Sequence, residues 1–382
     1  MKVSDFKVAR KLITGSGAVA QLRKEVARLG IRKPLIVTDT VLQGVGTVAL
    51  VEAQLAEIDF GVFNGVLPEP ETFIVAECQS QYLEGGHDGL IAVGGGSAMD
   101  IAKVVSAVAG YQGEIADLFG IDQVPEKGPP LIAIPTTAGT GSEVTNIAIL
   151  SDKAAKLKKG IVSDFLLPDV AIVSPEMTVT MPPPVTAASG IDALVHAVEA
   201  YISVNASPIT DALALGAIKL ISSSLPIAYS EPRNLSARES MVTGSLMAGM
   251  SFGNAGVGAV HAMAYPLGGR FDVAHGVSNA LLLPYVMRWN KEACLERFRD
   301  IAEAMGIASH ELPDGEAAEQ AVQRMDTLCR KVEIPKGLSS LGIPRSAIPE
   351  MAADAIKIDR LLKNNPRVLT EQDMVEIYQS AY

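Results

Sequence analysis

The sequence has few cysteines and no motif in which cysteines are paired. Cys78, Cys294 and Cys329 are far apart, so there is no CxxC pair from which a zinc knuckle or disulfide framework could be built. The first residues, MKVSDFKVARKLITGSG, lack the apolar stretch of a signal peptide. No apolar run is expected to reach the ~20 residues that span a bilayer. These absences predict a cytoplasmic chain without a membrane partner.

Basic residues are in the minority. The 382 residues include 32 Lys and Arg against 43 Asp and Glu, which gives a net charge of -11. A surface of this sign repels phosphate backbones, so nucleic acid is not an expected partner. Hydrophobic residues make up 48% of the chain, which is typical of a globular protein. Because single cores stop growing at ~250–300 residues, we expect two domains.

The first half of the chain alternates short apolar runs with amphipathic segments. This alternation predicts an α/β fold, in which a parallel sheet is covered by helices on both faces. The predicted strands cover residues 34–39, 60–65, 90–96 and 131–135, and the predicted helices cover residues 46–58, 71–84 and 97–109.

In the second half, strands give way to segments rich in Ala, Leu and Met, such as 190–202 and 211–225, which are predicted helices. Prolines interrupt helices and sheet ladders alike, so the cluster at 182–184 is the predicted boundary. The tail is predicted to be an NNPR loop followed by a short helix opened by Thr370. The expected domains are an α/β domain over 1–184 and an all-α domain over 185–382.

Three glycines end one predicted strand, in the segment VGGGSAMDIAK at 93–103. Gly95 and Gly96 have no side chain, so a diphosphate can approach the backbone closely. The helix that begins at Ser97 would offer it free N–H groups and the positive end of the helix dipole. An ordinary strand-to-helix turn, with Ser97 as N-cap, explains the same residues.

A second polar loop, PTTAGTGSEVTN at 135–146, follows another predicted strand. The carboxyl ends of parallel strands share one edge, so both loops are expected to line one ligand crevice. Asp39 ends strand 34–39, where its carboxylate can bind ribose hydroxyls and repel a 2′-phosphate, which favours NAD over NADP. A turn cap is the alternative role for Asp39. The hydroxyl groups of the second loop belong to Thr136, Thr137, Thr140 and Ser142.

Three of the five histidines stand in alanine-rich helical segments. Asp192 and His196 are four residues apart, so they share one face of a predicted helix and can bind the same ion. His261 lies on another predicted helix, and His275 follows beyond a glycine-rich loop. A buried carboxylate is costly unless a cation neutralises it. The four residues together therefore predict a metal site.

The residue types do not rank the possible metals. Mixed nitrogen and oxygen donors suit Fe(II), Zn(II), Ni(II) and Co(II). For one isolated histidine a core or capping role is more common than metal binding, but the joint pattern outweighs that prior. His87 and His310 lie in polar, turn-like contexts, and we leave them outside the site.

Several long segments, in order, resemble the iron-containing (group III) alcohol dehydrogenases, a family that includes lactaldehyde and propanediol oxidoreductases. The segments span nearly the whole chain: LIVTDTVL, GGGSAMDIAK, IPTTAGTGSEVTN, AASGIDALVHAVEAYIS, GNAGVGAVHAMAYPLGG and NNPRVLTEQDMVEIY. The resemblance implies a dinucleotide-binding α/β domain and a helical domain, as in the dehydroquinate synthase-like architecture. It also implies NAD, iron and a small alcohol or aldehyde substrate. A homodimer is expected, in which N-terminal strands such as KVARKLITG pair across subunits.

The resemblance also implies roles for single residues. It places the pyrophosphate at Gly95, Gly96 and Ser97, and the nicotinamide beside Thr136, Thr137 and Thr140. Asp100 and Ser142, from the same two segments, are included among the cofactor-binding residues. Lys158 resembles the ribose-contacting lysine of the family, although Lys156 and Lys159 leave the register open. All four metal ligands, Asp192, His196, His261 and His275, are present.

One position departs from the common pattern. Where many members of the family carry a second histidine (HxMAH), this chain has Tyr265 in HAMAY. Tyr265 shares a helix face with His261 and can donate a hydrogen bond to substrate, but its reference pKa of ~10 makes it a poor proton shuttle near neutrality. We take Tyr265 as the candidate catalytic residue. Phe252 is a candidate cleft wall, with core packing as an equally good explanation.

The expected reaction is the interconversion of a small primary alcohol or diol with its aldehyde. The metal would act as a Lewis acid on the substrate oxygen, and hydride would pass directly to or from nicotinamide. Two alternatives on the same fold are a hydroxyacid-oxoacid transhydrogenase and a polyol dehydrogenase. A third is a nucleotide- and metal-binding protein without catalysis, for which Tyr265 is the only support in the sequence.

Overall fold

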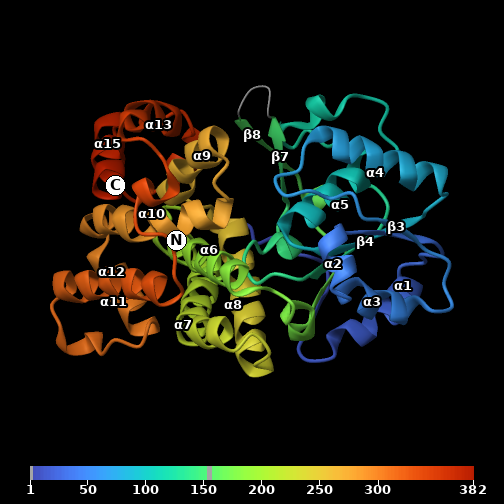
Figure 1. The fold of residues 1–382 in the computed structure, drawn as a ribbon, viewed down its shortest axis with the longest axis horizontal. Coiled ribbons are helices and arrows are strands. Elements are labelled where there is room, and N and C mark those ends of the chain that lie inside the picture. Colours follow the sequence, from blue (N-terminus) through green and yellow to red (C-terminus); the bar gives the residue numbers. More distant parts are fainter. Residues whose placement is uncertain (1–2, 153–156) are drawn as a thin grey trace. The chain divides into compact units, whose positions relative to one another are not determined.

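The computed structural model describes residues 3–152 and 157–382, which divide into two compact units. Lys7–Met181 forms one unit. Pro182–Tyr382, with the described residues before Lys7, forms the other. The strands and helices of both units are labelled in Figure 1.

The unit Lys7–Met181 is built on a six-stranded sheet in which all neighbouring strands are parallel. The strand order is β1-β9-β6-β4-β2-β3. The parallel α/β prediction is therefore confirmed, although β1 and β9 are additions to it. The strands are β1 (Leu12–Thr14), β2 (Pro34–Val37), β3 (Gly61–Phe63), β4 (Gly89–Gly94), β6 (Leu131–Pro135) and β9 (Val170–Val173).

Both faces of this sheet are covered, as near-continuous apolar strands require. Alternate residues point to opposite faces. Leu35 and Leu90 join the core cluster that contains residues of α4 and α5, whereas Ile36 and Ile91 join the cluster that contains residues of α1 and α3. The helices of this unit are α1 (Leu22–Arg28), α2 (Thr40–Gly44), α3 (Thr47–Glu52), α4 (Thr72–Glu84) and α5 (Gly96–Val108).

A second, three-stranded sheet was not predicted from the sequence. β7 (Ile147–Asp152) and β8 (Leu157–Val162) pair in antiparallel fashion, and β5 (Gly120–Ile121) pairs with β8 in parallel. The lysines of LKKGIV and the polar loop before Ile147 hide the strand pattern from a reading based on apolar runs.

β1 lies within the N-terminal segment KVARKLITG. Leu12–Thr14 pairs with Ala171–Val173 of β9 in the same chain. These residues form one edge of the chain's own sheet. Pairing of the segment KVARKLITG across subunits stays a prediction.

The described residues of Pro182–Tyr382 form helices and no strands. α6, α7 and α8 pack side by side (Figure 1). The α-helices are α6 (Pro183–Ile202), α7 (Pro208–Ser230), α8 (Leu235–Ala255), α9 (Ala259–Phe271), α10 (His275–Asn290), α11 (Leu295–Ala304), α12 (Asp314–Lys331), α13 (Ile348–Ala355), α14 (Asp359–Leu362) and α15 (Glu371–Ser380).

The prolines at 182–184, where the sequence predicts the domain boundary, lie at the start of α6, because proline in the first turn has no hydrogen bond to lose. The division between the two compact units falls between Met181 and Pro182. One detail of the helical unit corrects the sequence reading. α7 is, by length and composition, apolar enough to cross a membrane, contrary to the expectation that no such run exists. It packs against α6 and α8, and Asp211 in its first turn pairs with Arg297. At the tail, the prediction of a helix opened by Thr370 is confirmed, since Thr370 and Asp373 form a capping box.

Candidate metal centre and nucleotide loops

Asp192 and His196 lie on the buried face of α6, one turn apart. Their side chains are almost inaccessible to solvent. Burial raises the pKa of the Asp192 carboxyl, but three neighbouring histidines, His196 foremost, and an amide hydrogen bond from Asn279 lower it further, so it ends below its usual value. Asp192 is therefore an ionised carboxylate held in the interior of a helical unit.

His261 from α9 and His275 from the start of α10 converge on this carboxylate. One donor atom from each of Asp192, His261 and His275 lies within 4.8 Å of the others. The His196 ring stacks on the His261 ring with centroids 4.7 Å apart. The structure thus brings all four predicted ligand residues into one cluster, with His196 at its side.

Glu199, which the sequence analysis missed, orients His261. Its Oε2 accepts a hydrogen bond of 2.6 Å from His261 Nδ1, and its Oε1 accepts one of 2.6 Å from the backbone N–H of Val260. With its proton on Nδ1, His261 presents a bare Nε2 lone pair 4.0 Å from Asp192 Oδ1. Glu199 follows Asp192 by seven residues on the same helix face, so its position could have been noticed. Partners of this kind commonly orient metal-ligating histidines.

Asn279, one turn after His275 on α10, holds the other side of the cluster. Its amide nitrogen donates to Asp192 Oδ1 at 2.6 Å and lies 3.1 Å from His275 Nε2. Asn279 is fully buried. Its role arises only when α10 packs on α6, which no sequence spacing reveals.

The donor set suits a divalent cation. Among the described residues, His261 Nε2 is one of the few buried side-chain atoms without a hydrogen-bond partner, and it faces a buried carboxylate. Such an atom is costly unless it finds a ligand. Neutral imidazole nitrogens with one carboxylate oxygen form a site that binds a first-row divalent metal.

The two glycine and threonine loops of the other unit pack against each other. A Cβ on Gly96 would lie 2.9 Å from Thr140 Cγ2, and one on Gly95 would lie 3.3 Å from Thr137 Cγ2. The backbone N–H of Thr136 donates to Gly94 O at 2.9 Å. The lack of a side chain at both glycines permits this approach, which brings the start of α5 close to the second loop.

Asp100 and Ser142 enter a buried network that contains a lysine absent from the sequence analysis. Ser142 Oγ donates to Asp100 Oδ1 and accepts from Lys103 Nζ, both at 2.7 Å. Lys103 is fully buried, and burial lowers its pKa to about 8. Burial raises the pKa of nearby Glu143 to about 7. The network braces α5 against the second loop, while direct contact of Asp100 or Ser142 with a nucleotide stays a prediction.

Asp39 and Lys158 each have a partner within the chain. Asp39 caps α2 by accepting from the Leu42 N–H at 2.9 Å, which is the alternative role considered above. Lys158 on β8 pairs with Glu69 at 2.7 Å. Lys159 lies 5.4 Å from the centre of the Phe119 ring, and Lys156 lies outside the described residues. Ribose binding by Asp39 and Lys158 stays a prediction.

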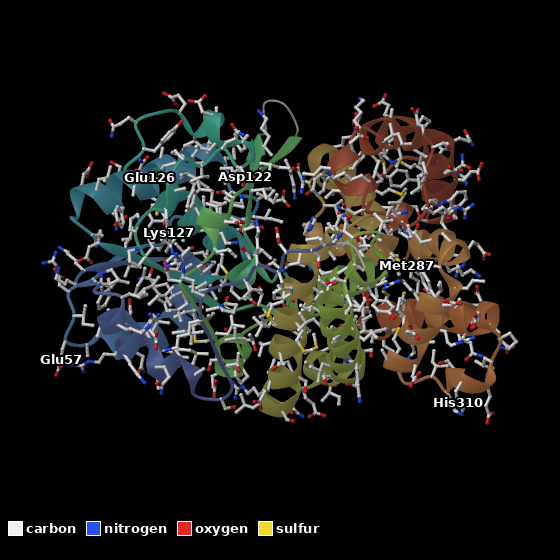
Figure 2. The ribbon with its side chains drawn as sticks, turned by 180° about the vertical axis from the view of Figure 1, so that it is seen from behind. Glu57, Asp122, Glu126, Lys127, Met287 and His310 are labelled. Carbon is white, nitrogen blue, oxygen red and sulfur yellow. The ribbon has the colours of Figure 1, made fainter. Side chains whose placement is uncertain are left out.

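Tyr265 and Phe252 border the metal cluster. The Phe252 ring stacks on His196 at 4.2 Å, and the Tyr265 ring lies 6.2 Å from the His275 ring. His310 stands on the exposed 3-10 turn Ser309–Glu311 (Figure 2), and His87 contacts the backbone oxygen of Lys33. Neither histidine is among the residues of the metal cluster.

Comparisons with known proteins give consistent matches along the chain. Residues 9–175 match the family described as iron-containing alcohol dehydrogenase, and residues 186–382 match the C-terminal part of the Fe-containing alcohol dehydrogenase family. Long-chain-alcohol dehydrogenase 1 of Geobacillus thermodenitrificans is 46% identical over 373 residues, which cover 96% of this chain and 94% of that protein.

Two further relatives agree. Lactaldehyde reductase of Escherichia coli is 39% identical over 372 residues, which cover 96% of this chain and 97% of that protein. The crystal structure of a 1,3-propanediol oxidoreductase is similar with a TM-score of 0.97 at 40% identity, covering 100% of both chains. The resemblance read from the ordered sequence segments is thus confirmed.

Proposed function

Because the chain belongs to the iron-containing alcohol dehydrogenase family, we propose that it is a metal-dependent, NAD(H)-linked oxidoreductase that interconverts a small primary alcohol or diol and its aldehyde. The observation that carries the proposal is the buried cluster of Asp192 and His261, in which an ionised carboxylate faces an unpartnered imidazole nitrogen.

We assign the metal to Asp192, His196, His261 and His275, with iron as the metal of the family. When bound, the metal supplies a Lewis acid for the substrate oxygen. Glu199 keeps the Nδ1 proton of His261, so that Nε2 remains a donor of its lone pair. The Asn279 amide holds the Asp192 carboxylate in place. These two side chains keep the donors oriented without themselves being ligands.

We assign the nucleotide diphosphate to Gly95, Gly96 and Ser97, where α5 begins and its first N–H groups have no helical partner. NAD supplies the acceptor or donor of hydride. Asp39 and Lys158 are proposed to bind ribose, and the acidic side chain of Asp39 favours NAD over NADP. We propose that the nicotinamide is bordered by Thr136, Thr137 and Thr140. The hydrogen bond between Ser142 and Asp100 holds this loop against α5.

Tyr265 is the candidate catalytic residue, as a hydrogen-bond donor to substrate. Its position 6.2 Å from the His275 ring supports this role. Its reference pKa of ~10 favours hydrogen bonding over proton relay near neutrality. Phe252, stacked on His196, is proposed to form an apolar wall beside the metal.

The proposal is tested with Asp192→Ala and His261→Ala. Each variant is expected to retain its circular dichroism spectrum and to lose metal-dependent NADH oxidation with a small aldehyde. His310→Ala, on an exposed turn, is the matched control and keeps full activity. Full activity in both metal-site variants would overturn the proposal. Release of free NADH during alcohol oxidation separates a dehydrogenase from a transhydrogenase.

We further propose that the enzyme acts in the cytoplasm as a homodimer, without nucleic-acid or membrane partners. The net charge of -11 and the packing of α7 against α6 and α8 support the last two points. Light scattering of the purified protein tests the dimer.

A further inference from the structure

The cationic side chain of Arg360 contacts Tyr265, which in turn borders the metal cluster. Arg360, on the short helix α14, has its Nη2 3.5 Å from the hydroxyl oxygen of Tyr265. The Tyr265 ring in turn lies 6.2 Å from the ring of His275. Tyr265 thus lies between the guanidinium group of Arg360 and His275 of the metal cluster.

The surroundings of this arginine are largely apolar. Tyr265 and Phe252 pack on a cluster formed by Val257, Ala262 and Leu361. Ile358 and Leu362, which flank Arg360 on its own segment, pack on the same cluster. Arg360 itself is half-buried. An apolar environment strengthens the attraction between a guanidinium group and an anion, because less water competes for the charge.

Arg360 differs from Arg270 and Arg297 of the same unit, each of which has an acidic partner. Arg270, on the same helix as Tyr265, pairs with Glu350 and Asp354, and Arg297 pairs with Asp211. Within the described part of the chain, no carboxylate lies at ion-pair distance from Arg360, and the 3.5 Å contact with a neutral hydroxyl is long for a hydrogen bond. The positive charge of Arg360 is therefore half-buried and is not neutralised by a carboxylate of the described residues.

We propose that Arg360 binds a carboxylate at the far end of the substrate, so that the preferred substrates are aldehydes with a terminal carboxylate and the corresponding hydroxy acids. The planar fork of a guanidinium group matches the two oxygens of a carboxylate, which a compact ammonium group does not. The reacting carbon then lies toward His275, and the carboxylate lies beyond Tyr265. This inference rests on the proposed alcohol-aldehyde oxidoreduction and specifies its substrate class.

The test compares kcat/KM for 4-oxobutanoate with that for butanal, which has the same chain length but no charge. The wild-type enzyme is expected to prefer 4-oxobutanoate. Arg360→Met is expected to lower the ratio of the two kcat/KM values by roughly 10- to 100-fold, the loss of hydrogen bonds to a charged group. Arg360→Lys restores part of the ratio. Lys363→Met removes an exposed positive charge three residues away and leaves the ratio unchanged.

Binding provides a readout that does not depend on turnover. Calorimetry of the wild-type holoenzyme is expected to give tighter binding of 4-hydroxybutanoate than of 1-butanol, and Arg360→Met removes the difference. Equal or better use of butanal by the wild type, or a ratio unchanged in Arg360→Met, overturns the inference while leaving the proposed oxidoreduction intact. Absence of metal-dependent turnover with either aldehyde overturns both.

Discussion

The proposed metal centre and the proposed nucleotide loops are built in opposite ways. The metal centre depends on side chains that are present: Asp192, His261 and His275 come from three helices, and Glu199 orients one of them. The loops depend on a side chain that is absent, since a Cβ on Gly96 would meet Thr140 at 2.9 Å. The difference teaches that substitutions should divide into two classes, one that weakens metal binding and one that weakens nucleotide binding.

Among the substitutions that test this division, the largest effect is expected from a change at Glu199. Glu199→Gln keeps an oxygen for the Val260 N–H, but its amide nitrogen cannot accept from His261 Nδ1. We expect metal affinity to fall by roughly 10- to 100-fold, as for other partners of metal-bound histidines, with no change in the Kd for NADH. Competition with a chelator measures the first quantity, and fluorescence titration measures the second.

Glu239→Gln, on the exposed face of α8, is the control for this change. If Glu199→Gln binds metal as tightly as the wild type, Glu199 does not orient the centre. If NADH affinity falls as much as metal affinity does, the two regions are not separate.

An intermediate effect on stability is expected at Glu143, behind the nucleotide loops. Burial raises its folded pKa from 4.5 to about 7, so between these values the folded protein holds a proton that the unfolded chain has released. Its contribution to the free energy of unfolding is therefore full below pH 4.5 and declines as the pH rises to about 7. In the wild type this decline lowers the free energy of unfolding by an amount on the order of 1–3 kcal/mol. Glu143→Gln has no carboxyl group at this position to titrate, so it is expected to lack the decline.

Denaturant unfolding across this pH range measures the difference between the wild type and Glu143→Gln. Glu126→Gln, an exposed position labelled in Figure 2, is the control and follows the wild type. Parallel pH profiles for the wild type and Glu143→Gln would show that Glu143 is not held protonated by burial.

The smallest effect is expected from one added methyl group. Gly96→Ala forces the loop away from Thr140 and is expected to raise the KM for NADH about tenfold, within the range for a small overpacking. Thr140→Ser removes the methyl group that the new Cβ meets and partly restores the KM. Gly110→Ala, where a Cβ meets nothing within 4 Å, is the control. A reduced metal content in Gly96→Ala would break the comparison between the two regions.

Much of the fold, and the residues that form the candidate metal cluster, could be predicted from the sequence, because local patterns encode them. The strand LIAIP and the pair Asp192 and His196 are visible as an apolar run and a helical spacing. The residues that could not be predicted are those whose roles depend on contacts between segments distant in the sequence. Asn279 meets Asp192 only when α10 packs on α6, and the contact of Lys103 with Ser142 forms only when α5 packs against the second polar loop.

The most direct test of the central claim is elemental analysis of the purified wild-type protein beside Asp192→Ala and His261→Ala. We predict that the wild type holds iron in equimolar amount with the chain, and that both variants keep their fold and their affinity for NADH but lose the metal. Metal retained in full by both folded variants would contradict the assignment of the centre to these residues.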